Sequence, residues 1–363
     1  MLMELLQTQA KGEYPVACLL IYGNQFQEIA YQIAGKLADN GVEIHFVKYA
    51  TLNNILGLAY HINKELKQIK PDIIHTHLRL AEFCLTVLKS VNLKTPVVNT
   101  VHGYRDLFKN KFVTASMSIR TMSVRQYLVK FIFRGLDGCI FISDFLLNFY
   151  LANKLVRGTE KTYRIDNACL AADINKPDDA KIDKNNVRLI LSGRLIEMKG
   201  HIFAFEAIKM LSAKYPSISL DCYGLGPYFD ALQRKAAELK IAGRVKFKGF
   251  TDNIVEKISE YDIALVPSMF ESFGIVFLDS FTAKVPVVAF DIPAGNEIIT
   301  DGYNGLLAEP KNSASLAAKI EMLIEDPELK NRIVVNAQKV LKEKYSMDLM
   351  VTKYLKVYQD VLG

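Results

Sequence analysis

Two acidic residues, Glu271 and Asp279, are eight positions apart in the stretch PSMFESFGIVFLDSF. Eight residues are slightly more than two turns of an α-helix, so both carboxylates would project from nearly the same face. Carboxylates accept hydrogen bonds from neutral hydroxyls, and sugars carry neighbouring hydroxyls in pairs. The spacing therefore indicates a site that grips a polar ligand at two points, where one carboxylate can hold a glycosyl unit and the other a ribose. The alternative is an acid at a helix start followed by a solvated acid, but the apolar run FGIVFL would bury this helix.

Two cations, Arg194 and Lys199, follow the apolar run RLILSG, where a strand would end and a helix begin. Gly193 and Gly200 would let the backbone turn there. An arginine fork and a lysine point charge together can bind a diphosphate. Taken alone the pattern is weak, because cations at strand ends are usually just solvated.

A second anion site is predicted at the start of the helix that carries Asp279. The backbone N–H groups of Phe273, Gly274 and Ile275 would lie in its first turn, where a helix offers no internal acceptor. Two phosphate sites in one domain indicate a ligand that carries a nucleotide.

Short apolar runs alternate with amphipathic helical patterns along nearly the whole chain, as in PVACLLIY, QEIAYQIAGKLADNG and VEIHFV. This alternation predicts an α/β fold with two doubly wound, Rossmann-like parallel-sheet domains that face a cleft. We expect an N-terminal domain over residues 1–170 and a C-terminal domain over residues 171–345. The last helix, residues 346–363, would pack back on the first domain.

The composition is that of an ordinary globular protein, with 363 residues, 50% hydrophobic and 23% charged. No apolar run approaches the roughly 18 residues of a membrane span, and MLMELLQTQA has no signal-peptide pattern. The five cysteines are odd in number and scattered among apolar neighbours, which is typical of reduced core thiols. These features favour a cytoplasmic location.

The net charge of +6 comes from the first half of the chain. Much of the excess lies in residues 104–135, where cations interleave with apolar residues and face one acid, Asp106. The cations are Arg105, Lys109, Lys111, Arg120, Arg125, Lys130 and Arg134. The stretch is either a solvated basic face or a docking surface for an anionic membrane or an anionic acceptor. It carries no nucleic-acid-binding motif, so no nucleic acid partner is expected.

Over nearly its whole length the chain resembles the family-four retaining glycosyltransferases of the GT-B fold, also called glycosyltransferase group 1. The similarity is carried by segments that are weak singly and specific in this order and spacing: KPDIIHTH, TPVVNTVHG, GCIFIS, GRLIEMKG, YGLGPYFDAL, VKFKGF, ESFGIVFLDSF and DGYNGLLAEP.

The resemblance implies a role for each predicted site residue. Arg194 and Lys199, next to Gly193, would bind the donor diphosphate, Glu271 the donor sugar, and Asp279 the ribose. His102 would face the donor sugar from the first domain, unless it is a satisfied core histidine. No Asp-x-Asp pair occurs in the chain, so we expect no metal cofactor, only a nucleotide-sugar co-substrate.

The chain departs from the family pattern in three places. The family's E-x7-E is E-x7-D here, and a segment that usually resembles IPNGVD is IDNACL, residues 165–170. The segment CLLIYGNQFQEIAYQIAGKLADNGVEIHFV resembles the family's second strand–helix–strand unit, so we expect the first strand and its glycine turn to be missing. Alternatively, VACLLIY is the first strand and GNQFQE a degenerate turn.

The leading hypothesis is therefore a retaining enzyme that moves a sugar from a nucleotide-diphosphate donor to a saccharide or lipid-linked acceptor. The family's commonest setting is bacterial surface polysaccharide assembly, at the inner face of the cytoplasmic membrane. One alternative is another sugar-nucleotide enzyme of the same architecture, such as a 2-epimerase. Another is a catalytically weak donor-binding protein, which Asp279 and the short N-terminus would favour.

Overall fold

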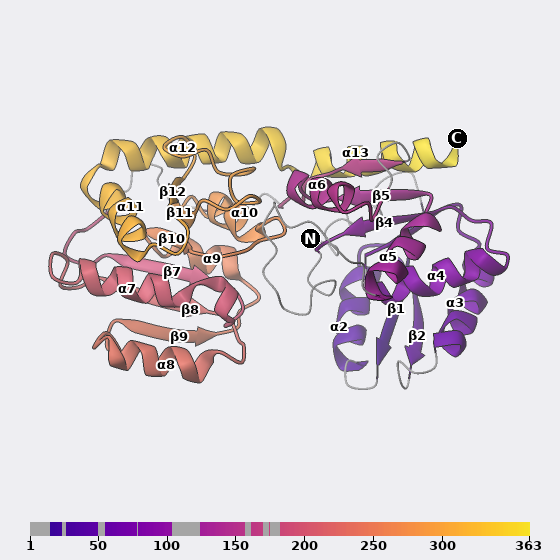
Figure 1. The fold of residues 1–363 in the computed structure, drawn as a ribbon, viewed down its shortest axis with the longest axis horizontal. Helices are drawn as coiled ribbons and strands as arrows, with labels where there is room; N and C mark the ends of the chain where they lie inside the picture. The colour runs from indigo at the N-terminus through magenta and orange to yellow at the C-terminus, as the bar shows by residue number, and fades with distance from the viewer. Residues whose placement is uncertain are drawn as a thin grey trace. The chain divides into compact units, whose positions relative to one another are not determined.

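The computed structural model describes residues 15–23, 27–49, 55–77, 79–103, 124–156, 161–169, 174 and 182–363. The chain divides into two compact units (Figure 1). Unit 1 consists of Met1–Asn167 together with Met347–Gly363, and unit 2 of Ala168–Ser346.

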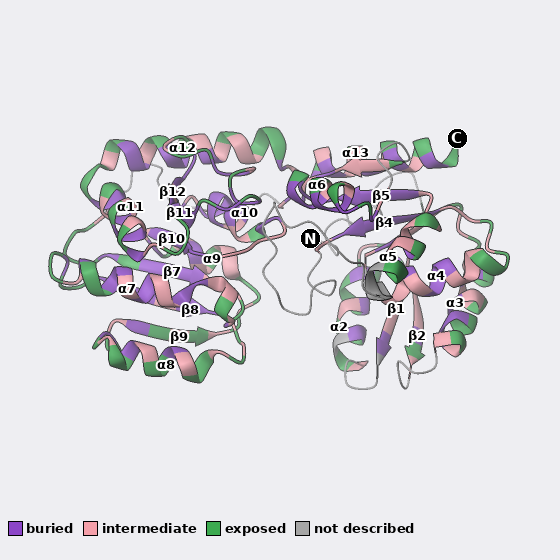
Figure 2. Ribbon diagram, in the orientation of Figure 1, coloured by how far each residue is buried: buried purple, intermediate pink, exposed green. Residues whose placement is uncertain are grey.

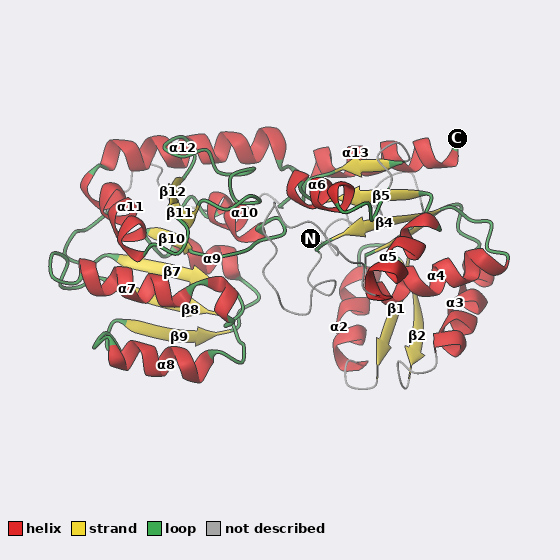
Figure 3. Ribbon diagram, in the orientation of Figure 1, coloured by secondary structure: helices red, strands yellow, loops and turns green. Residues whose placement is uncertain are grey.

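Unit 1 contains two parallel sheets among its described residues (Figure 3). The two-stranded sheet pairs β1 (Ala17–Gly23) with β2 (Glu43–Tyr49). The four-stranded sheet has the order β3 (Ile74–Thr76), β4 (Val97–Val101), β5 (Gly138–Phe141) and β6 (Thr162–Arg164). The absence of the family's first strand and glycine turn before β1 stays a prediction.

Helices connect these strands: α2 (Gln27–Ala38), α3 (Ile55–Ile69), α4 (Arg79–Val91), α5 (Val124–Arg134), α6 (Asp144–Ala152) and the C-terminal α13 (Met347–Leu362). Val47 of β2, Ile62 of α3, Leu85 of α4 and Val97 of β4 belong to one buried cluster. Burial of these apolar side chains therefore joins the two sheets in a single core.

Unit 2 is built on one six-stranded parallel sheet with the order β12-β11-β10-β7-β8-β9. Its strands are β7 (Arg188–Ser192), β8 (Ser219–Tyr223), β9 (Val245–Gly249), β10 (Ile263–Val266), β11 (Val287–Phe290) and β12 (Leu306–Ala308). Every residue of β10 and β11 is buried, as expected for apolar strands covered on both faces (Figure 2).

The helices of unit 2 are α7 (His201–Leu211), α8 (Phe229–Glu238), α9 (Ile254–Ser259), α10 (Ile275–Thr282), α11 (Ser313–Glu325) and α12 (Pro327–Lys344), with a short 3-10 turn at Glu197–Lys199. The chain leaves β7 toward β8 on one side and reaches β10 on the other. The strand order thus reverses at β7 and β10, and open α/β sheets bind ligands at the carboxyl ends of such strands. The predicted α/β class with doubly wound parallel sheets is confirmed.

No helix among the described residues is both long and apolar enough to cross a membrane.

Candidate active site

The loop after β7 is fastened to the loops that follow the neighbouring strands. Gly193 N–H donates to the carbonyl of Tyr223, the last residue of β8 (2.9 Å), and Met269 N–H, after β10, donates to the Met198 carbonyl (2.9 Å). Gly200 adopts φ 69°, and a Cβ there would lie 1.8 Å from the Pro267 carbonyl oxygen. Only glycine permits this approach, which holds the Arg194–Lys199 loop against the end of β10.

The loop brings two predicted site residues together. Lys199 Nζ lies 2.5 Å from Glu271 Oε1, and the two side chains are only 19% and 11% exposed. Arg194 is exposed and forms no ion pair with any described residue. Lys199, assigned to the diphosphate, and Glu271, assigned to the sugar, thus form one ion pair, and a second cation, Arg194, precedes Lys199 in the same loop.

The start of α10 provides the second predicted anion site. Gly274 caps the helix with φ 96°, and a Cβ there would lie 2.4 Å from the Phe277 ring. Within the described part of the chain, no backbone acceptor pairs with the N–H groups of Phe273, Gly274 or Ile275. These donors can therefore bind an anion.

One geometric prediction is wrong. Glu271 and Asp279 do not share a helix face, because α10 begins only at Ile275. The left-handed backbone at Gly274 separates Glu271 from the helix, which leaves Glu271 in the preceding loop next to Lys199.

Asp279 lies beside the segment that departs from the family pattern. The Cys169 thiol donates to Asp279 Oδ1 over 3.9 Å, and Thr282 Oγ1 donates to Cys169 Sγ over 3.5 Å. The two departures, IDNACL and E-x7-D, therefore meet in space. Sequence reasoning treated Cys169 as an ordinary core thiol, although its position inside IDNACL could have drawn attention to it.

We expect Asp279→Ala to weaken binding of a nucleoside diphosphate by about tenfold or more, because a charge-assisted hydrogen bond to a ribose hydroxyl contributes roughly 1.5–3 kcal/mol. Isothermal titration with UDP, GDP and ADP measures the change. Asp230→Ala, which removes an exposed acid from α8, is the matched control. Equal affinity of Asp279→Ala and wild type for every nucleotide that binds would remove Asp279 from the ribose site.

His102 follows β4 in unit 1, and its Nε2 lies 3.1 Å from Nδ1 of His77. Burial lowers the pKa of His102 to about 4, and burial with the nearby His102 lowers that of His77 to about 3. Both rings are therefore neutral near pH 7. Since one ring nitrogen of His102 has a polar partner, a satisfied core histidine and a ligand-facing histidine both fit this arrangement, and the role of His102 stays a prediction.

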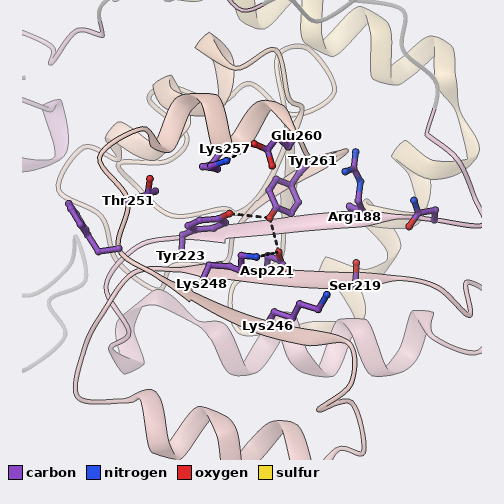
Figure 4. Close-up of a pocket in the computed structure, with 12 residues that line it drawn as sticks. Arg188, Ser219, Asp221, Tyr223, Lys246, Lys248, Thr251, Lys257, Glu260 and Tyr261 are labelled. Carbon is purple, nitrogen blue, oxygen red and sulfur yellow. Dashed lines mark hydrogen bonds and ion pairs between the residues drawn. The ribbon is translucent and has the colours of Figure 1, made fainter.

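A separate polar hollow of about 610 Å³ lies along β7, β8 and β9 of unit 2 (Figure 4). The Tyr261 hydroxyl donates to Asp221 Oδ2 (2.7 Å) there, and burial together with the Tyr223 and Asp221 hydrogen bonds raises the pKa of Tyr261. None of the predicted site residues lines this hollow. No group of three or more His, Cys, Asp or Glu side chains suited to a metal ion occurs among the described residues.

The two α/β units and their parallel sheets define a GT-B-like fold. Its structural neighbours include the Anabaena HepE complex with UDP-glucose, with a TM-score of 0.78 and 19% identity over 99% of this chain and 94% of that one. The Glycosyltransferase Family 4 model matches residues 23–167, and the Glycosyl transferases group 1 model matches residues 173–340. The chain belongs to this family of glycosyltransferases.

Two curated relatives match part of the chain. The poly(glycerol-phosphate) alpha-glucosyltransferase of Bacillus subtilis is 28% identical over 58% of this chain and 31% of its own length. The lipopolysaccharide core biosynthesis glycosyltransferase LpsE of Rhizobium meliloti is 28% identical over 55% of each chain. The matched regions thus span about half of these relatives or less.

Proposed function

We propose that this protein transfers a sugar, with retention of configuration, from a nucleotide-diphosphate donor to a saccharide or lipid-linked acceptor. The Lys199–Glu271 ion pair at the switch point of unit 2 carries the proposal, since it sets a cation and a sugar-binding acid side by side. Unit 2 would be the donor unit and unit 1 the acceptor unit.

In this proposal Arg194, Lys199 and the α10 N–H groups stabilise the charge that develops on the leaving diphosphate. Glu271 accepts hydrogen bonds from the donor sugar, and Asp279 accepts one from the ribose. His102 contacts a sugar hydroxyl. The family mechanism implies that the donor phosphate itself helps to deprotonate the acceptor, so no general base is required.

A thermal-shift screen against UDP-, GDP- and ADP-sugars tests the donor class, because a ligand that binds only the folded state raises the unfolding midpoint. Product analysis with the donor that binds then separates the candidates. A new glycosidic bond supports transfer, an epimerised nucleotide sugar identifies a 2-epimerase, and binding without turnover identifies a donor-binding protein.

Turnover should survive EDTA, because in this proposal side-chain cations and backbone N–H groups neutralise the leaving group. The test compares initial rates with excess EDTA, with added Mg²⁺ and with added Mn²⁺. A rate that EDTA abolishes and either cation restores would contradict this assignment.

We further propose that the protein acts in bacterial surface polysaccharide synthesis, on the cytoplasmic side and in peripheral contact with the membrane. The names of the two relatives support such acceptors, and one of them, poly(glycerol-phosphate), is itself a polyanion. Most of the basic stretch 104–135 lies outside the described residues. Its last part, α5, exposes Tyr127, Leu128 and Phe131 on the helix that also carries Lys130 and Arg134. Exposed aromatic residues among cations suit an anionic interface.

Changing Lys109, Lys111, Arg120 and Arg125 together to Gln should reduce binding to anionic vesicles by about a hundredfold or more, at roughly 1 kcal/mol for each cation near the surface. Co-sedimentation with phosphatidylserine-containing vesicles measures this, and high salt should mimic it. Changing the exposed Arg332, Lys339, Lys342 and Lys344 of α12 to Gln is the control of equal charge. If neither the first variant nor high salt reduces vesicle binding, the stretch is only a solvated basic face.

A further inference from the structure

Three histidines form a ladder at the carboxyl ends of β3 and β4 in unit 1. The ring centroids of His75 and His77 are 4.2 Å apart, and those of His77 and His102 are 5.4 Å apart. His77 follows the last residue of β3, and His102 follows the last residue of β4. The ladder therefore runs from His75, within β3, to the residues that follow the ends of β3 and β4.

The inner ring of the ladder is held on both sides. His75 Nδ1 lies 2.6 Å from the Tyr358 hydroxyl of α13, and His75 Nε2 lies 2.8 Å from Thr100 Oγ1. Both nitrogens of His75 are thus occupied, so His75 packs against the face of His77 without competing for its Nδ1.

The outer two rings share a single hydrogen bond, between His77 Nδ1 and His102 Nε2. A neutral imidazole has one N–H and one bare nitrogen, so one ring donates and the other accepts. If His77 donates, His102 carries its proton on Nδ1 and His77 Nε2 is bare. If His102 donates, the roles of these two outer nitrogens reverse. Neither outer nitrogen has a partner among the described residues.

We propose that His77 is a positioning residue for His102. Its hydrogen bond anchors His102 Nε2 and leaves Nδ1 as the one polar atom that His102 offers to a ligand. Because the pair is neutral, that atom suits a sugar hydroxyl, which can donate or accept, better than a phosphate oxygen, which requires a donor and favours a cation. The assignment of a sugar hydroxyl rests on the proposed function.

The pairing itself can be tested without turnover, in free full-length protein labelled with ¹⁵N-histidine. NMR distinguishes Nδ1–H from Nε2–H tautomers. The shared bond requires the Nδ1–H fraction of His77 to equal that of His102, and His77→Leu should shift the fraction of His102. Unequal fractions in the wild type, or an unchanged His102 in His77→Leu, would overturn the pairing.

The kinetic test uses two substitutions of His77 and the donor found in the screen. His77→Leu removes the hydrogen bond, and His77→Asn restores an amide nitrogen near the position of Nδ1. We expect His77→Leu to lower kcat about tenfold with donor KM within about twofold, and His77→Asn to recover most of the loss. Equal losses in both variants would show that His77 serves packing only.

The two tests fail separately. If no donor is turned over, the proposed function fails while the tautomer measurement still decides the pairing. UDP titration of His77→Leu controls for general damage, since the predicted nucleotide site lies in unit 2.

Discussion

Lys199→Met should lower kcat/KM for the nucleotide-sugar donor by roughly 10²- to 10³-fold, the usual effect of removing one group that stabilises developing charge. Glu271→Gln should lower kcat by a similar factor, because its proposed partner is the donor sugar. The two variants should differ in nucleotide affinity. Lys199→Met should weaken UDP-type binding, whereas Glu271→Gln should leave it unchanged or strengthen it, because Lys199 then has no carboxylate beside it.

The same ion pair predicts an effect on stability. Both side chains are largely buried, and removal of one partner of a buried pair costs about 3–5 kcal/mol because the other charge stays without compensation. The double variant Lys199→Met/Glu271→Gln leaves neither partner of the pair as an unpaired charge. It should therefore unfold at a higher temperature than the Lys199→Met single variant.

Two further variants complete the experiment. Arg194→Ala should weaken nucleotide binding without a loss of stability, because Arg194 is exposed, and Lys209→Ala on α7 removes an exposed cation as the control. Calorimetric titration, steady-state kinetics and thermal unfolding give the three readouts. Wild-type kinetics in both Lys199→Met and Arg194→Ala would end the diphosphate assignment.

The fold class follows from local patterns, which is why the sequence predicts it. Buried strands such as IALV in β10 and VVAF in β11 are continuous apolar runs between turn residues. Arg194 and Lys199 could be placed in the loop after a strand by the same reasoning. The partner of Lys199 could not be predicted in this way. The Lys199–Glu271 contact joins residues 72 positions apart, and only the strand order of the sheet brings them together.

The errors and omissions have equally local causes. The shared-face prediction for Glu271 and Asp279 assumed a continuous helix, and the left-handed Gly274 breaks it. His75 and His77 were seen only as part of KPDIIHTH. Their spacing of two places both side chains on one strand face, but only the pairing of β3 with β4 sets them against Thr100 and His102.

Acid should destabilise unit 1 well before its carboxylates titrate. Burial, with added repulsion from the neighbouring rings, lowers the pKa of His75 and His77, and burial lowers that of His102. In the unfolded chain the histidine side chains have a pKa of about 6.5. Below pH 6.5 the unfolded chain therefore binds more protons than the folded unit does. The free energy of unfolding therefore falls as the pH falls from 6.5 toward about 4.

The expected size is about 2 kcal/mol for each such histidine between pH 7 and pH 5, since each full pH unit below 6.5 contributes about 1.4 kcal/mol. Unit 2 has one comparable group, His201. It is buried, both of its ring nitrogens have no partner among the described residues, and burial lowers its pKa to about 4. With three such histidines against one, unit 1 should lose up to about three times as much stability as unit 2.

Hydrogen exchange followed by mass spectrometry measures the two units in one sample. After correction for the intrinsic pH dependence of exchange, peptides from β3 and β4 should lose more protection at pH 5 than peptides from β10 and β11. His77→Leu removes one titrating group from unit 1, so it should flatten the pH dependence there by about 2 kcal/mol, whereas Leu56→Ala, which changes an exposed residue of α3 without a titrating group, should not. Equal loss of protection in both units would contradict the prediction. It would mean that protonation of the histidine ladder does not lower the free energy of unfolding of unit 1 more than that of unit 2.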